Sequence, residues 1–154
     1  MTEPSATAPG LRLAQCNIAR LQAPIDAPET ADFVAALDSI NALAEASPGF
    51  VWRLQDDSGN ATSIQAFDDE MLIVNMSVWE SVEALSAFTY RSAHKDVLRR
   101  RREWFEPMAD ASVVLWWVPA DTLPTVEEAQ TRLESLRRDG PTAEAFTFRT
   151  VVEP

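Results

Sequence analysis

Residues 71–79, MLIVNMSVW, are the stretch that decides the fold prediction. Apolar residues occur here at both odd and even positions, which is typical of a strand covered on both faces of its sheet. Asn75 interrupts the run with an amide, and a buried amide needs hydrogen-bond partners. We therefore expect a central strand with a layer of structure on each side.

The segment that follows this strand holds most of the rare side chains. Residues 77–106 contain the only His, the only Tyr and two of the five Trp. Ser77 or Ser81 can cap a helix, and we expect residues 81–105 to be mainly helical. At about 100° per residue, one face of that helix carries Ala87, Tyr90, Arg91, His94, Leu98, Arg101, Arg102 and Phe105. Polar groups replace the apolar repeat of a core helix on this face, so we expect it to line a pocket.

The remaining elements follow from hydrophobic period. Strands are predicted at residues 11–19, 50–55, 111–118 and 145–152. Helices are predicted from about residue 28 to 47 and from 125 to 140, the second capped by Thr125 and closed by Gly140. The first elements, β-α-β-β-α-β, match the α+β, ferredoxin-like arrangement, with an added C-terminal helix and strand. We expect one such domain over residues 11–154, after a disordered tail at residues 1–10.

Composition narrows the classes of function. The net charge of −11 opposes binding to nucleic acid, which depends on phosphate neutralisation by Lys and Arg, and to anionic membranes. A single cysteine, Cys16, excludes an intramolecular disulfide and a multi-cysteine metal site. The first residues lack the pattern of a signal peptide, and no apolar run approaches the length of a membrane span. We expect a cytoplasmic protein.

The strands also suggest a partner. A ferredoxin-like fold places its helices on one face of the sheet, yet the strands carry Trp52, Trp116 and Trp117. An exposed apolar face needs cover, and a second copy related by two-fold symmetry is the simplest cover. We therefore predict a homodimer whose sheets pack face to face.

His94 is the first candidate for chemistry, because an imidazole titrates near neutral pH and can move a proton. It is equally a candidate for a buried structural His, or for a haem or metal ligand. Arg91, Arg101 and Arg102 are candidates for holding a carboxylate or enolate, or for pairing with the excess acidic residues.

The strands and the helix supply further candidates. Asn17 and Asn75 are either pocket donors or satisfied structural amides. Trp79, Trp104 and Tyr90 are candidate pocket walls, although core or interface is the simpler reading for most of the Trp residues. Adjacent Trp116 and Trp117 must face opposite sides of a strand, and we assign Trp116 to the pocket. Cys16 has no activating base in the sequence and is expected to be an inert buried thiol.

Several segments resemble a known family. The segments WES, EAL and SAH within residues 79–94 resemble the antibiotic-biosynthesis-monooxygenase-like group of the dimeric α/β-barrel superfamily. Longer runs resemble the bacterial family DUF3291, in a match from about residue 11 to 124: LAQCNIA (13–19), SVWESVEAL (77–85), YRSAH (90–94), REWF (102–105) and WWVPA (116–120).

The resemblance implies a ferredoxin-like protomer, a dimeric barrel and a pocket between sheet and helices. The superfamily includes cofactor-free monooxygenases of aromatic polyketides, haem-degrading enzymes, cyclases, isomerases and ligand-binding modules. The chain has no clear counterpart to the Asn-plus-His pattern of the haem-degrading members.

We therefore expect a small enzyme that acts on an apolar or aromatic, oxygenated metabolite without a cofactor or metal. By resemblance it is a cofactor-independent monooxygenase, or a cyclase or isomerase. His94 would move a proton, and Arg91 or Arg102 would stabilise an enolate. The alternatives are a non-catalytic dimeric module that binds a small molecule, and a haem-binding protein that uses His94.

Overall fold

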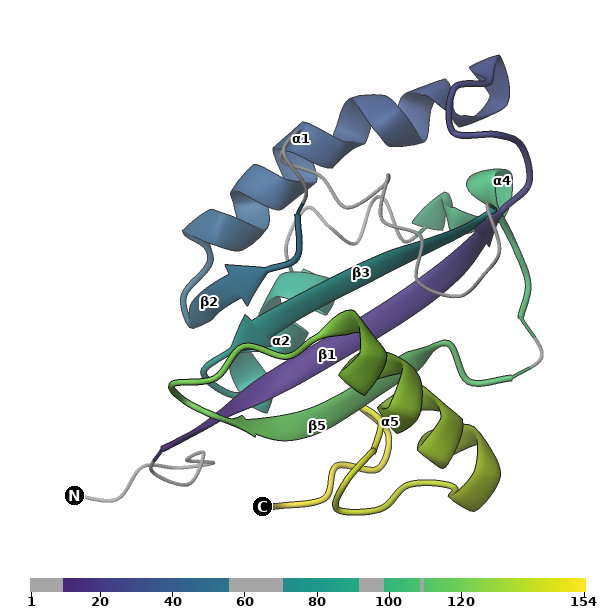
Figure 1. Cartoon of the computed structure of the whole chain (residues 1–154). Helices are drawn as coiled ribbons and strands as arrows, with labels where there is room; N and C mark the ends of the chain where they lie inside the picture. Colours follow the sequence, from purple (N-terminus) through teal and green to yellow (C-terminus); the bar gives the residue numbers. More distant parts are fainter. Residues whose placement is uncertain (1–9, 56–70, 92–98, 109) are drawn as a thin grey trace.

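The structure, a computed structural model, has an antiparallel sheet at its centre and helices against both faces of that sheet (Figure 1). The central strand β1 (Leu11–Leu21) is hydrogen-bonded to β3 (Leu72–Trp79) on one side and to β5 (Val113–Pro119) on the other. Strand β2 (Phe50–Arg53) lies at the edge, beyond β3. The structure describes residues 10–55, 71–91, 99–108 and 110–154.

The topology confirms the predicted fold class. The order β2-β3-β1-β5, with every neighbouring pair antiparallel, is that of the ferredoxin-like βαββαβ arrangement. One short strand was not predicted: β4 (Phe105–Glu106) pairs with the end of β1, on the same side as β5.

Helix α1 (Ala31–Ala46) connects β1 to β2 and follows a short 3-10 turn, Pro28–Thr30. At its C-terminal end the hydroxyl of Ser47 donates a 2.7 Å hydrogen bond to the carbonyl oxygen of Leu43. The chain then turns into β2 at Gly49, whose φ of 84° is a backbone conformation that glycine adopts without steric cost. Ser-Pro-Gly thus ends the helix where the sequence predicted.

Three further helices complete the described elements. Helix α2 (Val82–Arg91) follows Ser81, whose hydroxyl oxygen accepts a 3.1 Å hydrogen bond from the backbone N–H of Ala84. The short helix α4 (Arg101–Trp104) precedes β4, and α5 (Val126–Asp139) follows β5. Among the described residues, no helix is long and apolar enough to cross a membrane.

Both predicted caps of α5 are confirmed. The hydroxyl oxygen of Thr125 accepts a 3.1 Å hydrogen bond from the backbone N–H of Glu128. Gly140 closes the helix with a φ of 75°, and its N–H donates to the carbonyl oxygen of Leu136 at 2.9 Å.

The two faces of the sheet are divided by residue parity. Side chains of odd-numbered residues in β1 and β3 face α1 and α2, whereas those of even-numbered residues face α5. In Figure 1, α5 crosses in front of β1 and β5 while α2 lies behind the sheet. The even face forms one core with α5, made of Ala14, Cys16, Ile18, Val74, Met76, Val78, Val114, Trp116, Val118, Ala129, Leu133 and Leu136.

This second layer changes the basis of the dimer prediction. We expected the even face to need a second copy of the chain, but α5 of the same chain packs on it. Val74 is 4% exposed and Trp116 is fully buried. Most of the apolar surface that motivated a face-to-face dimer is therefore already covered, and the homodimer stays a prediction.

One element prediction was wrong at its C-terminal end. Residues 81–105 were expected to be mainly helical, and the described part is helical over Val82–Arg91 and Arg101–Trp104, with Arg100, at φ −94° and ψ 5°, outside α4. Phe105 has already entered the sheet, where it pairs with Leu21. Helical period continues through this segment, yet pairing with the free end of β1 gives its last residues a strand conformation.

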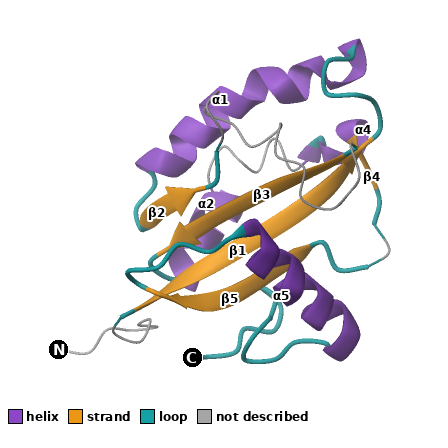
Figure 2. Ribbon diagram, viewed as in Figure 1, coloured by secondary structure: helices purple, strands orange, loops and turns teal. Residues whose placement is uncertain are grey.

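The prediction of a final strand was also wrong. The segment 145–152 contributes only an isolated bridge between Phe146 and Leu115 to the sheet, and Figure 2 shows it as loop after α5. Its apolar side chains are still used, because Phe146 is fully buried against β5.

Candidate functional site

A cavity of about 660 Å³ lies between the odd face of the sheet and helices α1 and α2. Its floor comes from β1 and β3, and its roof from α1 and α2. Small-molecule sites in proteins commonly have volumes of this order. The resemblance implied a pocket between sheet and helices, and this cavity is the candidate for it.

An apolar cluster closes each end of the floor. At one end Leu13, Trp79 and Leu85 pack together, and at the other end Leu21 and Phe33 do so. Between the clusters the floor is polar. Its centre consists of four uncharged side chains, Gln15, Asn17, Asn75 and Ser77.

Two amides face one another in this centre. Asn17 and Asn75 are direct partners in the register of β1 and β3, and such partners have Cβ atoms about 5 Å apart on one face. Both line the cavity, with Asn17 half-buried and Asn75 exposed. Within the described residues, the Asn17 side chain makes no hydrogen bond. Both residues were candidates from the sequence, either as pocket donors or as structural amides, and both lie in the cavity lining; their role as ligand donors stays a prediction.

The other two floor residues bind Asn75 and Trp79 into one network. Gln15 Nε2 donates to Asn75 Oδ1 and to Ser77 Oγ, each at 2.8 Å. Trp79 Nε1 donates to the same Ser77 Oγ at 2.8 Å. Gln15 and Ser77 are each 7% exposed, so the bonds that Ser77 accepts from Gln15 and Trp79 are sheltered from competing water, whereas the bond to the exposed Asn75 is only partly so.

Trp79, a candidate wall residue, lies at one end of the cavity lining but is 1% exposed, and its role as a wall stays a prediction. Its ring stacks on that of Phe88 with centroids 5.2 Å apart, and Phe50 meets it edge-on at 5.4 Å. Tyr90 also lines the cavity but is 53% exposed, with its ring edge-to-face with that of Phe148 at 5.6 Å. A planar apolar ligand would therefore meet aromatic surface at this end.

Two of the predicted wall residues lie elsewhere. Trp104 is 2% exposed and packs in the cluster with Leu21 and Phe33, outside the cavity lining. Trp116 is on the even face beneath α5, so the sheet separates it from the cavity. Its neighbour Trp117 takes the odd face, as alternation required, and donates from Nε1 to the Val152 carbonyl oxygen at 2.9 Å.

The predicted cationic residues lie at the second end. Arg101 and Arg102 line the cavity there, and both are exposed. The backbone of this turn is fixed by Gln22, whose Nε2 donates to the carbonyl oxygens of Arg102 and Phe105, both at 2.8 Å. His94 and the side chain of Arg91 lie outside the described part of the chain.

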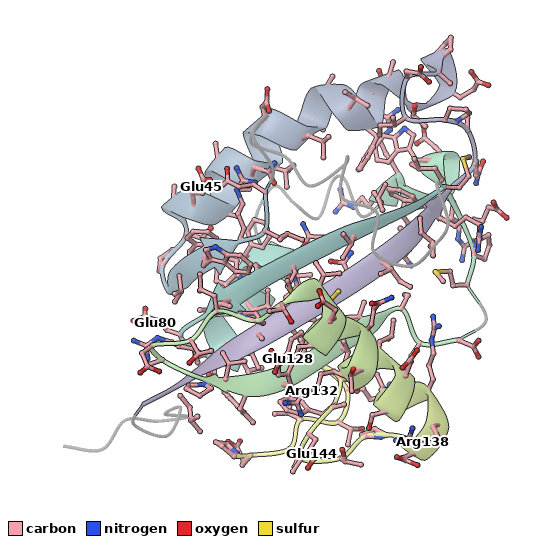
Figure 3. The ribbon with its side chains drawn as sticks, in the orientation of Figure 1. Glu45, Glu80, Glu128, Arg132, Arg138 and Glu144 are labelled. Atoms are coloured by element: carbon pink, nitrogen blue, oxygen red, sulfur yellow. The ribbon has the colours of Figure 1, made fainter. Side chains whose placement is uncertain are left out.

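Arg53 is a lining residue that the sequence did not suggest. Its side chain is only 11% exposed, and Nε lies 2.8 Å from Glu45 Oε2. Figure 3 shows Glu45 near the C-terminal end of α1, beside β2. The ion pair neutralises the charge of this largely buried guanidinium, and it links α1 to the edge of the sheet.

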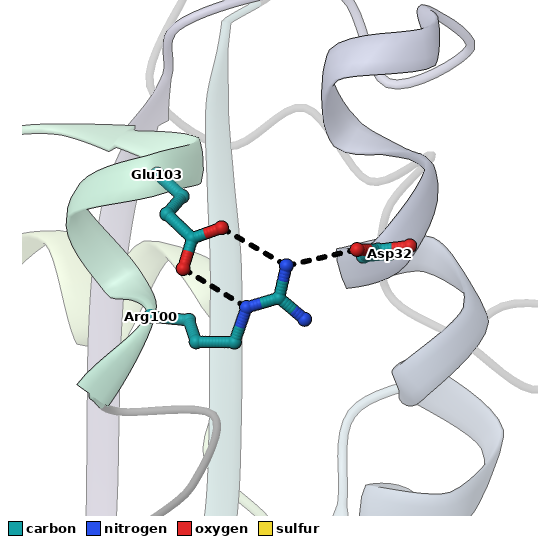
Figure 4. Close-up of polar contacts among 3 residues, drawn as sticks. All are labelled: Asp32, Arg100 and Glu103. Atoms are coloured by element: carbon teal, nitrogen blue, oxygen red, sulfur yellow. Dashed lines mark hydrogen bonds and ion pairs between the residues drawn. The ribbon is translucent and has the colours of Figure 1, made fainter.

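Arg100 is on the surface, and it joins two helices. Its guanidinium lies 2.8 Å from Asp32 of α1 and 2.9 Å from Glu103 of α4 (Figure 4). Hydrogen bonds from Arg100 lower the pKa of the Glu103 carboxyl group. The guanidinium also lies over the ring of Trp104, 4.8 Å from its centroid. These contacts support the cavity end without entering it.

Cys16 fits the expectation of an inert thiol. It is 1% exposed and lies on the even face. Burial away from water disfavours the thiolate and raises the pKa of Cys16 to about 12. It therefore has no part in the chemistry of the cavity.

The polar floor was only half predicted, because Gln15 and Ser77 were not chosen as candidates. The signal was present in the alternation of the strands: Gln15 shares a face with Asn17, and Ser77 shares one with Asn75.

In the part of the chain that the structure describes, no group of three His, Cys, Asp or Glu side chains could hold a metal ion.

The fold is similar to those of several proteins of known structure. No curated protein matches the chain at a significant level. Similar solved structures include a protein of Pseudomonas aeruginosa (15% identity, 78% of this chain and 100% of the other, TM-score 0.47). Another is a conserved protein of Methanosarcina mazei Go1 (12%, 71% and 93%, 0.49).

A third is SnoaB, a cofactor-independent oxygenase from Streptomyces nogalater (17%, 74% and 98%, 0.45). The assignment to a family rests on a sequence match of much greater extent. The model of the family described as "Domain of unknown function (DUF3291)" matches residues 12–154, which is nearly the whole chain. The chain belongs to the DUF3291 family.

Proposed function

We propose that this chain is a small-molecule enzyme whose substrate is an apolar or aromatic, oxygenated metabolite. One observation carries the proposal: a cavity of about 660 Å³ has aromatic surface at one end and an uncharged row of amides and hydroxyl across its floor. A ligand that is apolar over most of its surface, with oxygens at its centre, matches both features.

The floor suits a substrate that develops negative charge on oxygen. Amide N–H and hydroxyl donors held by a hydrogen-bond network, as Asn75 and Ser77 are, stabilise an enolate or phenolate with little reorganisation. Arg102, at the other end of the cavity, is our proposed source of positive charge. His94 remains our proposed proton acceptor, and Arg91 a second cation.

The resemblance to the antibiotic-biosynthesis-monooxygenase-like group makes cofactor-independent oxygenation the first reaction to test. In the oxidation of an anthrone, the methylene carbon loses both C–H bonds and gains a C=O bond to one atom of O₂. The other oxygen atom leaves as water. The substrate supplies all four electrons, so the protein has only to desolvate it, orient it and remove a proton.

The experiment uses dithranol, an anthrone, in air-saturated buffer at mildly acidic pH, where uncatalysed oxidation is slow. Formation of the anthraquinone is followed by absorbance, and consumption of O₂ by an electrode. We expect His94→Ala and Arg102→Ala each to lower turnover by about 10²-fold, in the range for a lost proton-transfer group or charge. Arg138→Ala, an exposed residue of α5, is the matched control for removal of a guanidinium.

The outcomes separate the hypotheses. Full turnover in both His94→Ala and Arg102→Ala would remove those residues from the mechanism. Saturable quenching of tryptophan fluorescence by dithranol, without product, would leave a binding module instead of an oxygenase. A Soret band on titration with haemin that disappears in His94→Ala would favour the haem alternative.

The homodimer is proposed on the resemblance alone, since α5 covers the sheet face. Light scattering coupled to size-exclusion chromatography distinguishes a 17.1 kDa monomer from a dimer of twice that mass. A monomer at every concentration would show that α5 has taken the place of the second copy.

A further inference from the structure

The hydrogen bonds of the floor have a direction. Trp79 donates to Ser77, Gln15 donates to Ser77 and also to Asn75, and every distance is 2.8 Å. An indole N–H can only donate, so the chain of bonds is anchored at Trp79. Both lone pairs of the Ser77 oxygen are occupied, and one oxygen lone pair of Asn75 is used.

The groups that remain open follow from this direction. The Asn75 Oδ1 faces Gln15, which leaves the two N–H groups of Nδ2 without a partner among the described residues. The Ser77 hydroxyl, having accepted two hydrogen bonds, can only donate its own proton further. The Trp79 N–H is committed to Ser77 and its ring is 1% exposed, so this side chain anchors the network and offers a ligand no donor.

We propose that Gln15 and Ser77 are positioning residues that hold the Asn75 amide with its N–H₂ group toward the cavity, and that the site therefore selects planar ligands with a central carbonyl or enolate oxygen. This inference rests on the proposed function and names the substrate class for the same cavity. It assigns roles to two residues whose own polar atoms are largely consumed by the protein.

Gln15 is the residue that sets the polarity. It lies opposite Ser77 in the register of β1 and β3, and its Nε2 reaches two acceptors at once. A carboxylate at this position would accept where Gln15 donates. The Asn75 amide would then turn over to donate to it, and the Asn75 carbonyl oxygen would face the cavity.

The test uses two tricyclic probes of nearly the same size and shape. Fluorenone offers a carbonyl acceptor at its central ring, whereas carbazole offers an N–H donor there. The dissociation constant of each is measured by quenching of tryptophan fluorescence. For the natural chain we expect fluorenone to bind about 10-fold more tightly than carbazole. The N–H group of carbazole would face the donor groups of the cavity, and those donors would be left without an acceptor.

Gln15→Glu is expected to reduce that ratio to about 1 or invert it. Because a buried carboxylate can impair folding, Asn75→Asp at the exposed partner provides a second route to the same change of polarity. Gln130→Glu, on α5 at the opposite side of the sheet, is the matched control. It makes the same chemical change and should leave the ratio unaltered.

The results are distinguishable. An inverted ratio in Gln15→Glu or Asn75→Asp, with the natural ratio in Gln130→Glu, supports the inference. Tight binding of both probes with a ratio that neither variant alters overturns it, while the aromatic-ligand proposal stands. A natural preference for carbazole overturns the assigned amide direction. Failure of the natural chain to bind either probe overturns the proposed function together with the inference.

Discussion

Ser77→Ala tests the floor network through stability. Among the described residues, the substitution removes the one acceptor of Trp79 Nε1 and one of two acceptors of Gln15 Nε2. A buried donor left without a partner costs about 1–3 kcal/mol. Gln15 retains Asn75, so its loss is at the lower end, and we expect unfolding free energy to fall by about 2–4 kcal/mol.

This is a large part of the 5–15 kcal/mol typical of a domain. Urea unfolding followed by circular dichroism measures the change, and the melting temperature should fall by roughly 4–16 °C for a chain of this length. Ser39→Ala, on the exposed side of α1, is the control, and it should be neutral or slightly stabilising because Ala favours helix.

A double-mutant cycle with Trp79→Phe isolates the bond between the two residues. Trp79→Phe removes the donor, so its cost in the Ser77→Ala background should be about 1–2 kcal/mol smaller than in the natural chain. The reasoning is refuted if Ser77→Ala costs less than about 0.5 kcal/mol, or if the two substitutions are additive. Either result would mean that water from the cavity replaces the Ser77 oxygen without loss.

Two further predictions concern the scaffold, and a third concerns pH. Gly49→Ala should cost about 2–5 kcal/mol in urea unfolding, since its Cβ would lie 2.5 Å from that of Ala84 in α2 at a φ of +84°; Gly10→Ala, with the same φ and open space, isolates the backbone part and should cost less. Thr125→Ala removes the cap of α5 and should cost about 1 kcal/mol in the same assay; no change would mean that water caps the helix equally well. Burial raises the pKa of Cys16 from 9.0 to about 12, so its contribution is complete below pH 9 and is lost as pH rises to 12, because only the unfolded chain ionises. The natural chain should lose about 1.4 kcal/mol more than Cys16→Ala between pH 8 and pH 10, and equal pH profiles of the two chains would contradict this.

The sequence predicted the sheet well because strand alternation is a local property. Leu13, Gln15 and Asn17 repeat with a period of two, and so do Asn75, Ser77 and Trp79. Once the ferredoxin-like order was inferred, β1 and β3 had to be neighbours. Asn17 and Asn75 were chosen as candidates because each is an amide in an apolar strand, before any register was known.

Tertiary contacts decided what the sequence could not. Phe105 continues a helical period, yet it pairs with Leu21 in the sheet, and no pattern within residues 81–105 reports that distant partner. Trp104 and Trp116 were candidates because large aromatic side chains suit either pockets or cores. Only the placement of α1 and α5 shows that both belong to cores.

The amphipathic face of α5 illustrates the same limit. Its spacing of Ala129, Leu133 and Leu136 predicted that the helix packs on something apolar, and the structure shows that face on the sheet. The sequence did not say whether the even face would be covered by this helix or by another chain. That choice depends on the path of the connection after Pro119, which carries no periodic signal.

The division of β1 and β3 by parity separates two kinds of evolutionary pressure. A substitution at Asn17 or Asn75 alters what the cavity recognises, whereas one at Cys16 or Met76 alters the core beneath α5. Selectivity can thus drift at alternate positions of the same strands without disturbing the packing on the other side. A single-residue insertion in β1 would exchange the two sets of side chains between the faces. Substitutions leave the faces unchanged, so we expect libraries at positions 17 and 75 to yield folded proteins with new ligand preferences.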